Sequence, residues 1–268
     1  MKEYTLKEYI AHLIVGTPLQ QPAQYLRKII KVRKRWKHPE LKEVYQESSY
    51  IDQMMERMIQ DPMNCIDIGC HIGSMLSLIL QYSPHGHHIA IEPTPYKAKW
   101  LKHKFPKVNI QQIALSDTPS EATFYHYPHK SGFNGLRHKQ KIANDKQFKV
   151  RCERLDDVVP SDRQIDFIKV DVEGGELNVF RGANNLLQRC QPYLLFECTR
   201  SGLTSFGLSP NEIFNFLTQQ HSYSVFLIKD WLNGKEPLNL EKFSHAMQYP
   251  FQAFNFIAST ENSGKLGS

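Results

Sequence analysis

The apolar residues of the chain follow two different patterns, and the N-terminal part has the spacing of helices. In the N-terminal part, apolar positions recur every three or four residues within polar sequence, which is typical of helices. The pattern predicts helices near residues 5–14, 21–36 and 39–60, and Pro39 stands where a proline can begin a helix. We expect residues 1–60 to form an N-terminal helical cap rather than a separate domain.

From Asn64 onward, short apolar segments alternate with helical patterns. The apolar segments are CIDI, HHIAI, VNIQQIAL, IDFIKVDV and YLLFEC, and helical patterns such as SMLSLIL and YKAKWLKHKF come between them. This alternation predicts an α/β fold with a doubly wound, mostly parallel sheet covered by helices on both faces. YSVFLI and FQAFNFIAS come last, without a clear helix between them, so we expect an antiparallel pair at the end of the sheet.

Residues 118–155 interrupt the alternation. ATFYHY and FKVRCERL lie on either side of the polar stretch PHKSGFNGLRHKQKIAND. This arrangement predicts an inserted hairpin whose loop is long enough to cover a substrate. Together with this insertion, residues 61–262 are expected to form the main domain.

Composition narrows the class of protein. A chain of 268 residues with 41% hydrophobic content can bury one substantial core, and no stretch approaches the roughly 20 apolar residues of a membrane-spanning helix. The five cysteines form no CxxC pair, and no histidine pair has the spacing that makes a zinc site convincing. We expect a cytoplasmic protein with reduced thiols.

Positive charge is concentrated in one segment. The net charge is +6, and residues 27–42 carry eight Lys or Arg against one Glu, so the rest of the chain is close to neutral. On a helix these residues form a basic face, which is either a solvated face over a core-packing stripe or a peripheral contact with a membrane or an anionic substrate. Nucleic acid is disfavoured, because one short basic helix is not a recognisable nucleic-acid fold.

The stretch CIDIGCHIG, residues 65–73, has the form of a ligand-binding turn between a strand and a helix. Gly69 permits a tight turn, and Gly73 allows the helix to pack closely on the strand. His71 occupies the position where a dinucleotide site normally has glycine, and Asp67 ends the strand with a negative charge. An acid beside free backbone N–H groups suits S-adenosylmethionine, whose charged end carries an amino and a carboxylate group.

Glu92 follows the next strand, in the stretch HHIAIEPTP. A carboxylate at that position can accept hydrogen bonds from both hydroxyls of a ribose, although the same acid would also serve NAD. Gln112 and Ile113, after the third strand, are expected to lie beside the adenine. A nicotinamide-dependent oxidoreductase and a catalytically idle cofactor-binding domain therefore stay open as alternatives.

Several stretches together resemble the FkbM family of S-adenosylmethionine-dependent methyltransferases. They are CIDIGCHIG, IAIEPTP, IALSD, SGFNGL and IDFIKVDVEGGELNVFRGA, which span about residues 60–200. The resemblance implies a class I, Rossmann-like methyltransferase fold. It also implies methyl transfer to an acceptor such as a hydroxyl of a sugar, a glycolipid or a polyketide-like natural product. Two departures are Gly175, where alanine is expected, and His71, where the family more often has asparagine.

Three acids are candidates for the chemistry. Asp171 and Glu173 lie in the segment DVEG, and Glu197 ends the strand YLLFEC. In the resembling fold Asp171 points toward the methyl group of the cofactor, so Asp171 or Glu173 is a candidate general base. Alternatively, Asp171 and Glu197 hold Mg²⁺, or Glu173 and Glu176 only cap the next helix. Lys169, in the strand, is expected to orient one of these acids.

The acceptor is expected to meet the inserted loop. His129, Phe133, Asn134 and Arg137 lie in or beside SGFNGL and are candidate substrate-binding residues. They would contact a small-molecule or glycan hydroxyl acceptor.

Overall fold

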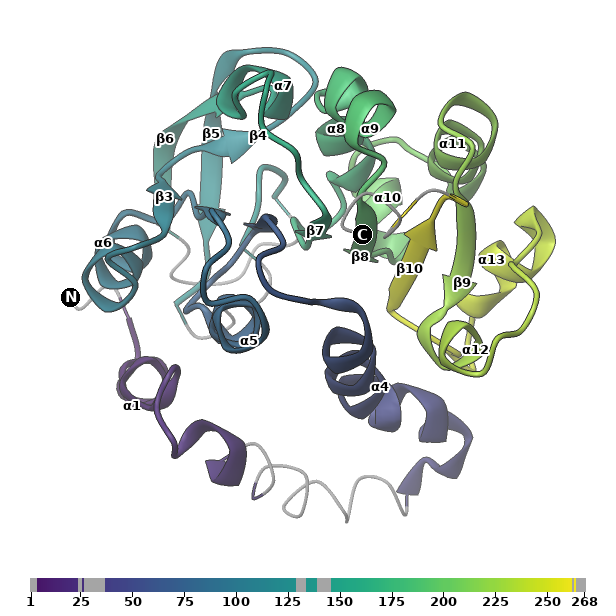
Figure 1. Cartoon of the computed structure of the whole chain (residues 1–268), viewed down its shortest axis with the longest axis horizontal. Helices are drawn as coiled ribbons and strands as arrows, with labels where there is room; N and C mark the ends of the chain where they lie inside the picture. The colour runs from purple at the N-terminus through teal and green to yellow at the C-terminus, as the bar shows by residue number, and fades with distance from the viewer. Residues whose placement is uncertain are drawn as a thin grey trace.

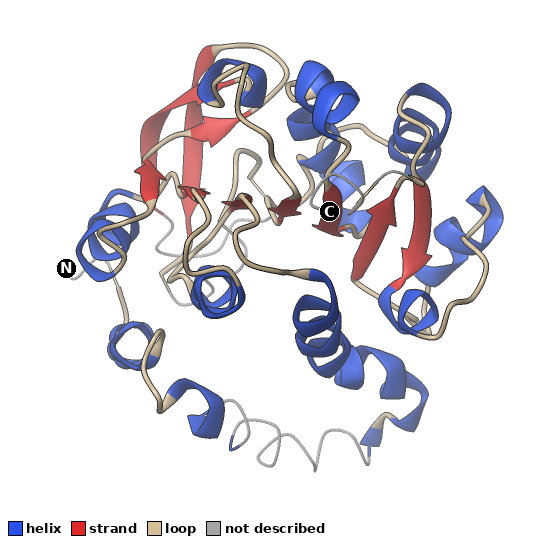
Figure 2. Ribbon diagram, in the orientation of Figure 1, coloured by secondary structure: helices blue, strands red, loops and turns tan. Residues whose placement is uncertain are grey.

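The structure is a computed structural model, and it describes residues 4–23, 26, 37–128, 134–138, 146–261 and 263. A central sheet carries helices on both faces, and the N-terminal helices run along one side of the molecule (Figures 1 and 2). The first predicted helix is α1 (Leu6–Ile14), and the third is the short turn η1 (Pro39–Leu41) with α4 (Lys42–Met58). Most of the predicted basic helix lies outside the described residues.

The main sheet has seven strands in the order β3-β2-β1-β7-β8-β10-β9. Their bounds are β1 (Cys65–Ile68), β2 (Ile89–Ile91), β3 (Asn109–Gln111), β7 (Phe167–Val170), β8 (Tyr193–Glu197), β9 (Ser224–Leu227) and β10 (Asn255–Ser259). The first five strands in this order pair in parallel, and β10 is antiparallel to both β8 and β9. This topology confirms the predicted Rossmann-like, mostly parallel sheet.

The predicted antiparallel pair at the end of the sheet is confirmed by β9 and β10, but two details of this end differ from the prediction. The antiparallel strand β10 lies inside the sheet, between β8 and β9, because the chain passes β9 at the edge before returning. Two short helices, α12 (Ile228–Leu232) and α13 (Leu240–Ala246), lie between these strands, where the sequence had suggested none. At five and seven residues they are too short to produce a clear helical period.

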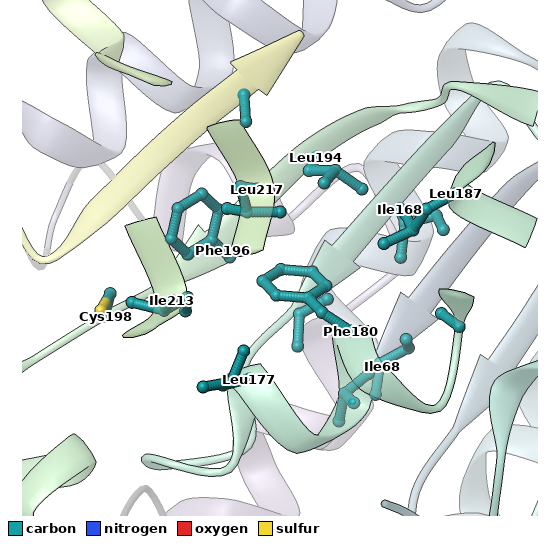
Figure 3. Close-up of a cluster of buried hydrophobic side chains, with 14 of the residues drawn as sticks. Ile68, Ile168, Leu177, Phe180, Leu187, Leu194, Phe196, Cys198, Ile213 and Leu217 are labelled. Carbon is teal, nitrogen blue, oxygen red and sulfur yellow. The ribbon is translucent and has the colours of Figure 1, made fainter. Parts of the chain in front are cut away.

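Alternating residues of the strands bury opposite faces of the sheet. Ile168 and Phe196 point toward one layer, formed by α8 (Glu176–Arg181), α9 (Asn184–Cys190), α11 (Pro210–Asn215) and α13 (Figure 3). Phe167 and Leu195 point to the other layer, where α4, α5 (Ser74–Tyr82) and α12 cover them. Burial on both faces explains why these strands are mostly apolar, with Lys169 as a charged exception in β7.

The region of the predicted insertion contains an antiparallel pair of strands. β5 (Ser120–His126) and β6 (Lys146–Glu153) pair antiparallel along their whole length, and β4 (Ala114–Leu115) adds a parallel strand to β6. The stretch VNIQQIAL is therefore divided between two sheets, with β3 in the main sheet and β4 in the small one.

Two further observations concern the cysteines and the apolarity of the helices. All five cysteines are buried and none is in a disulfide. Within the described residues, no helix combines the length and the apolarity needed to cross a bilayer.

Candidate active site

A cavity of about 460 Å³ opens at the carboxyl edge of the parallel strands. Its size falls within the range of about 300–1,000 Å³ that is usual for small-molecule sites. The predicted site residues that line it come from six separate segments of the chain: Gly69, His71, Glu92, Ile113, Asn134, Asp171, Glu173 and Glu197. The carboxyl ends of parallel strands share one edge, so the fold itself brings these segments together.

Other predicted residues do not line this cavity. Gln112 is exposed, and Arg137 is exposed with its guanidinium 5.3 Å from the ring centre of Phe206. Asp67 is fully buried and is not among the residues that line the cavity, and its Oδ1 lies 3.5 Å from Lys169 Nζ. His129 and Phe133 lie outside the described residues.

Gly73 is required for packing. A Cβ at this position, where φ is +86°, would lie 2.6 Å from the ring of Phe105 and 2.8 Å from the side chain of Leu101. Leu101 belongs to α6 (Pro95–Lys104), so Gly73 allows α5 to begin close against that helix.

The turn after β1 is closed by its own hydrogen bonds. The N–H groups of Gly69 and Cys70 both donate to the carbonyl of Ile91, at 2.9 and 3.2 Å. A Cβ on Gly69 would lie 1.9 Å from the carbonyl oxygen of Asp171, so only glycine fits. His71 has a φ of 54°, a left-handed value that is uncommon outside glycine and asparagine. The N–H of His71 donates to the carboxylate of Glu92. The N–H groups of Gly69, Cys70 and His71 are therefore already bonded within the protein, whereas the sequence predicts that they are free to bind a ligand.

Glu92 links the turn to the end of β2. Its Oε2 accepts from the N–H of His71 at 2.9 Å, and its Oε1 accepts from the N–H of Thr94 at 2.9 Å. A carboxylate has about four acceptor positions, so the buried Glu92 can still bind two ligand hydroxyls. Ile113 and Phe124 provide an apolar wall in the same cavity. A buried acceptor beside an apolar wall suits the ribose and adenine of S-adenosylmethionine.

The other half of the cavity is acidic. Asp171 follows β7, Glu197 ends β8, and Glu173 lies two residues after Asp171. One carboxylate oxygen of each of these three acids lies within 4.8 Å of one carboxylate oxygen of the other two. Glu173 has a left-handed φ of 63°, and Gly174 follows at φ +113°, where a Cβ would lie 2.3 Å from the carbonyl oxygen of Gly202. Consecutive uncommon backbone conformations are typical of functional turns.

One proton is shared within this cluster. Burial opposes ionisation of Asp171, but the nearby charge of Lys169 and hydrogen bonds from Glu197 and Lys169 hold the pKa of Asp171 below its usual value. Burial and the negative charge of Asp171 raise the pKa of Glu197 to about 9. At neutral pH, Glu197 is therefore protonated and donates to an ionised Asp171.

Lys169 is the cation that sets this state. Its Nζ lies 3.2 Å from Asp171 Oδ2, 3.5 Å from Asp67 Oδ1 and 3.2 Å from the carbonyl oxygen of Gly69, to which it donates. The side chain is buried, and the two acids raise its pKa despite the opposing effect of burial. Lys169 therefore contacts the neighbouring acid Asp171 and also anchors the glycine turn.

Three carboxylates this close can also bind a divalent cation through hard oxygen ligands. An ion would have to displace the proton of Glu197, because a metal ligand must be deprotonated. Mg²⁺ bound by Asp171 and Glu197 stays a prediction.

The N-terminal helix α1 reaches this site, which the sequence pattern does not predict. Glu8 of α1 is buried, with its Oε1 3.4 Å from Lys97 Nζ and 3.5 Å from His71 Nε2. The hydroxyl of Tyr96 donates to Glu8 Oε2 at 3.1 Å. Lys97 is almost completely buried and lines the cavity, and its place between the apolar residues Tyr96 and Ala98 is the only sequence signal of that burial.

Asn134 connects the inserted loop to the small sheet. Its Oδ1 accepts from the N–H of Tyr127 at 2.8 Å, and its Nδ2 lies 3.0 Å from Nδ1 of the buried His126. Gly135 forms an isolated antiparallel bridge with Tyr125. These contacts hold the described part of the SGFNGL stretch against the cavity.

Comparison with protein families finds one match over most of the main domain. A family described as the methyltransferase FkbM domain matches residues 67–225. A curated relative, the AMB antimetabolite synthetase AmbE of Pseudomonas aeruginosa, is 24% identical over 234 residues. That alignment covers 70% of this chain and 11% of AmbE, so this chain spans about a tenth of that protein.

Solved structures of similar fold include two methyltransferases. The methyltransferase FkbM of Methylobacillus flagellatus is 14% identical, with 74% of this chain and 44% of that chain covered at a TM-score of 0.46. A SAM-dependent O-methyltransferase of Thermotoga maritima is also 14% identical, with 80% and 64% covered at a TM-score of 0.42.

Proposed function

Since the chain belongs to the FkbM family of methyltransferases, we propose that it transfers a methyl group from S-adenosylmethionine to a hydroxyl oxygen. The observation that carries this proposal is the composition of one cavity. One part, with Glu92 and Ile113, suits a nucleoside, and another part of the same cavity is lined by three acids. The acceptor we propose is a sugar, a glycolipid or a polyketide-like natural product.

S-adenosylmethionine would supply an electrophilic methyl group on a sulfonium. Glu92 would accept hydrogen bonds from the ribose hydroxyls, and Ile113 would pack against the adenine. Most of the rate would come from alignment, because methyl transfer needs the acceptor oxygen, the methyl carbon and the sulfur in line. The negative charge of the acidic half also favours a cationic ligand over a phosphate.

Asp171 is the proposed base. It is the ionised member of the acidic pair, and it lines the cavity. An acceptor hydroxyl that donates to Asp171 would be fixed in orientation and would lose its proton to that carboxylate as the C–O bond forms. Lys169 would act as a positioning residue, because its contact with Asp171 holds the carboxylate in place and ionised.

The choice of acceptor class rests on two features. Glu173, Asn134 and Asn178 also line the cavity and carry hydrogen-bonding groups, which suit an acceptor with several hydroxyls. The relative AmbE is named as an antimetabolite synthetase, which is consistent with a natural product.

Calorimetric titration with S-adenosylhomocysteine and with NAD separates this proposal from an oxidoreductase. We expect binding of S-adenosylhomocysteine and none of NAD, because the N–H groups of Gly69, Cys70 and His71 are already bonded within the protein. Labelled S-adenosylmethionine is then incubated with a panel of hydroxylated sugars and natural products, and the methylated atom is located by NMR. Methylation on nitrogen or carbon would contradict the hydroxyl assignment, and NAD binding would contradict the cofactor.

A further inference from the structure

Helix α1 has an inverted distribution of polar and apolar residues. Its buried residues are Glu8 and His12. Leu6, Ile10 and Leu13 lie on the outer side, with exposed fractions of 74%, 47% and 52%. These three residues are spaced at i, i+4 and i+7, so they form one apolar stripe. An exposed stripe of this kind marks an interaction surface rather than a core.

The inner contacts of α1 fix the helix in this orientation. Glu8 is held by Tyr96 and Lys97, and the ring of His12 stacks on Trp100 with centroids 4.4 Å apart. Lys104 donates to the carbonyl oxygens of His12 and Val15 at the end of the helix. Rotating α1 to bury its apolar stripe would break all of these contacts, so the exposure is imposed by the fold.

The exposed charged residues of α1 and of α6 are cationic. α6 packs beside α1 (Figure 1), and its exposed charged residues are lysines. Lys99 and Lys102 on α6, Lys107 just after it and Lys7 on α1 are all exposed. Within residues 4–23 and 95–108, as the structure describes them, the single carboxylate is Glu8, and it is buried.

We propose that α1 and α6 form a docking surface for an anionic phospholipid bilayer. An apolar stripe next to lysines matches the acyl boundary and the charged headgroups of such a bilayer. The basic segment 27–42 follows α1 in the sequence and adds charge of the same sign. This surface is distinct from the cavity, and its inner side is joined to the cavity by the contact of Glu8 with His71.

Vesicle sedimentation at low salt tests the proposal. The protein should sediment with vesicles of phosphatidylcholine and phosphatidylserine, not with phosphatidylcholine alone, and binding should fall as salt is added. The triple variant Leu6→Gln, Ile10→Gln, Leu13→Gln should lose this binding. Changing Lys99, Lys102 and Lys107 to Gln should weaken it by roughly a hundredfold, at about fivefold for each lysine near a charged bilayer.

Matched controls change the same chemistry elsewhere. Tyr249→Gln is the control for the apolar stripe, because it removes a large side chain that is 61% exposed in the loop before β10. The control for the lysines is the triple variant Lys149→Gln, Arg151→Gln, Lys242→Gln, which removes three exposed charges from other elements. These controls should bind as the parent does. Absence of binding at low salt, or equal loss in the controls, would overturn the proposal.

The same variants separate the bilayer from other occupants of the stripe. The melting temperature of the triple variant at Leu6, Ile10 and Leu13 should equal that of the parent, because exposed side chains contribute little to stability. A lower melting temperature would show that another segment of the chain covers the stripe. A change from dimer to monomer in sedimentation velocity would show that a second copy does. Either result refutes lipid docking, and neither depends on methyl transfer.

Discussion

Asp171 and Glu197 are both acids at the edge of one sheet, but their surroundings give them different roles. Lys169 Nζ lies 3.2 Å from Asp171 Oδ2 and keeps Asp171 ionised. Burial and the negative charge of neighbouring acids raise the pKa of Glu197, so Glu197 keeps its proton. Neighbouring carboxyls whose pKa values are driven apart are typical of acid–base sites. Glu173 lies beside both, so its part must be tested together with theirs.

Substitution separates these roles. Asp171→Asn keeps the shape but removes the charge, so turnover should fall about a hundredfold or more while affinity for S-adenosylhomocysteine changes little. Glu197→Gln resembles the protonated form and should keep most of the activity at pH 7. Glu173→Gln shows whether the third acid shares the role of Asp171.

Chelation then distinguishes a direct base from a metal site. A direct base is indifferent to EDTA, and Glu197→Gln stays active. A Mg²⁺ site loses activity with EDTA, recovers it with added Mg²⁺ and is damaged equally by Asp171→Asn and Glu197→Gln. Full activity of Asp171→Asn would leave alignment alone as the source of catalysis.

Glu92 has two functions that a single substitution can confuse. Alanine at this position would remove the ligand acceptor and also leave the N–H groups of His71 and Thr94 without their partner. Glu92→Gln is the better variant, because an amide still offers one acceptor oxygen. We expect it to weaken S-adenosylhomocysteine binding by about 1 to 3 kcal/mol, the range for a hydrogen bond to a charged group. The exposed Glu121→Gln is the calorimetric control, and equal affinity in both variants would remove Glu92 from the cofactor site.

At the scale of elements, the sequence predicts what depends on local pattern. The strands CIDI, IAI and FIKV are apolar because both faces are buried, and the acids that follow strands fall at the shared carboxyl edge. Contacts between distant segments leave no such pattern. Glu8 meets Tyr96 across 88 positions of sequence, and nothing in the pattern of α1 distinguishes its inner face from its outer one. The position of Gln112 after a strand predicts that it lies beside the adenine, but the chain continues there into β4 and the side chain of Gln112 is exposed.

The inserted hairpin gives a prediction at this scale. Asn134 joins the SGFNGL stretch to β5 through Tyr127 and His126, so Asn134→Ala should loosen the loop without touching the glycine turn. The KM for the acceptor should rise about tenfold, as expected for the loss of roughly 1.4 kcal/mol of positioning, and affinity for S-adenosylhomocysteine should stay the same. Faster amide exchange confined to residues 134–138 would show that the effect is local. A weaker cofactor affinity would instead place Asn134 in the cofactor half.

Across the whole molecule, buried ionisable groups have pKa values that move in opposite directions. Burial raises the pKa of Asp67, of Glu176 to about 7 and of Glu197 to about 9. Burial also lowers the pKa of His12 to about 4 and of His71 to about 3. Near pH 7 Glu197 keeps its proton and both imidazoles are neutral in the folded state, so the interior holds fewer charges than its composition suggests.

The pH dependence of stability follows from these directions. Between about pH 7 and 8.5 the histidines are neutral in both states, but an unfolded glutamate is ionised while folded Glu197 keeps its proton. The folded state then binds more protons, so the free energy of unfolding should fall as the pH rises, by up to about 1.4 kcal/mol per pH unit for each such carboxyl. Below about pH 6.5 the histidines act in the opposite sense, because the unfolded chain takes up protons that folded His12 and His71 do not, and the decline should flatten.

Urea unfolding at a series of pH values measures this dependence. Glu197→Gln carries no titrating proton, so it should be more stable than the parent at pH 8.5 and should show a shallower decline from pH 7. Glu121→Gln, which alters an exposed acid on β5, should keep the slope of the parent. If the parent instead gains stability between pH 7 and 8.5, Glu197 is ionised in the folded protein. The shared proton that keeps Asp171 as the charged acid would then be absent, and with it the division of roles between the two carboxyls.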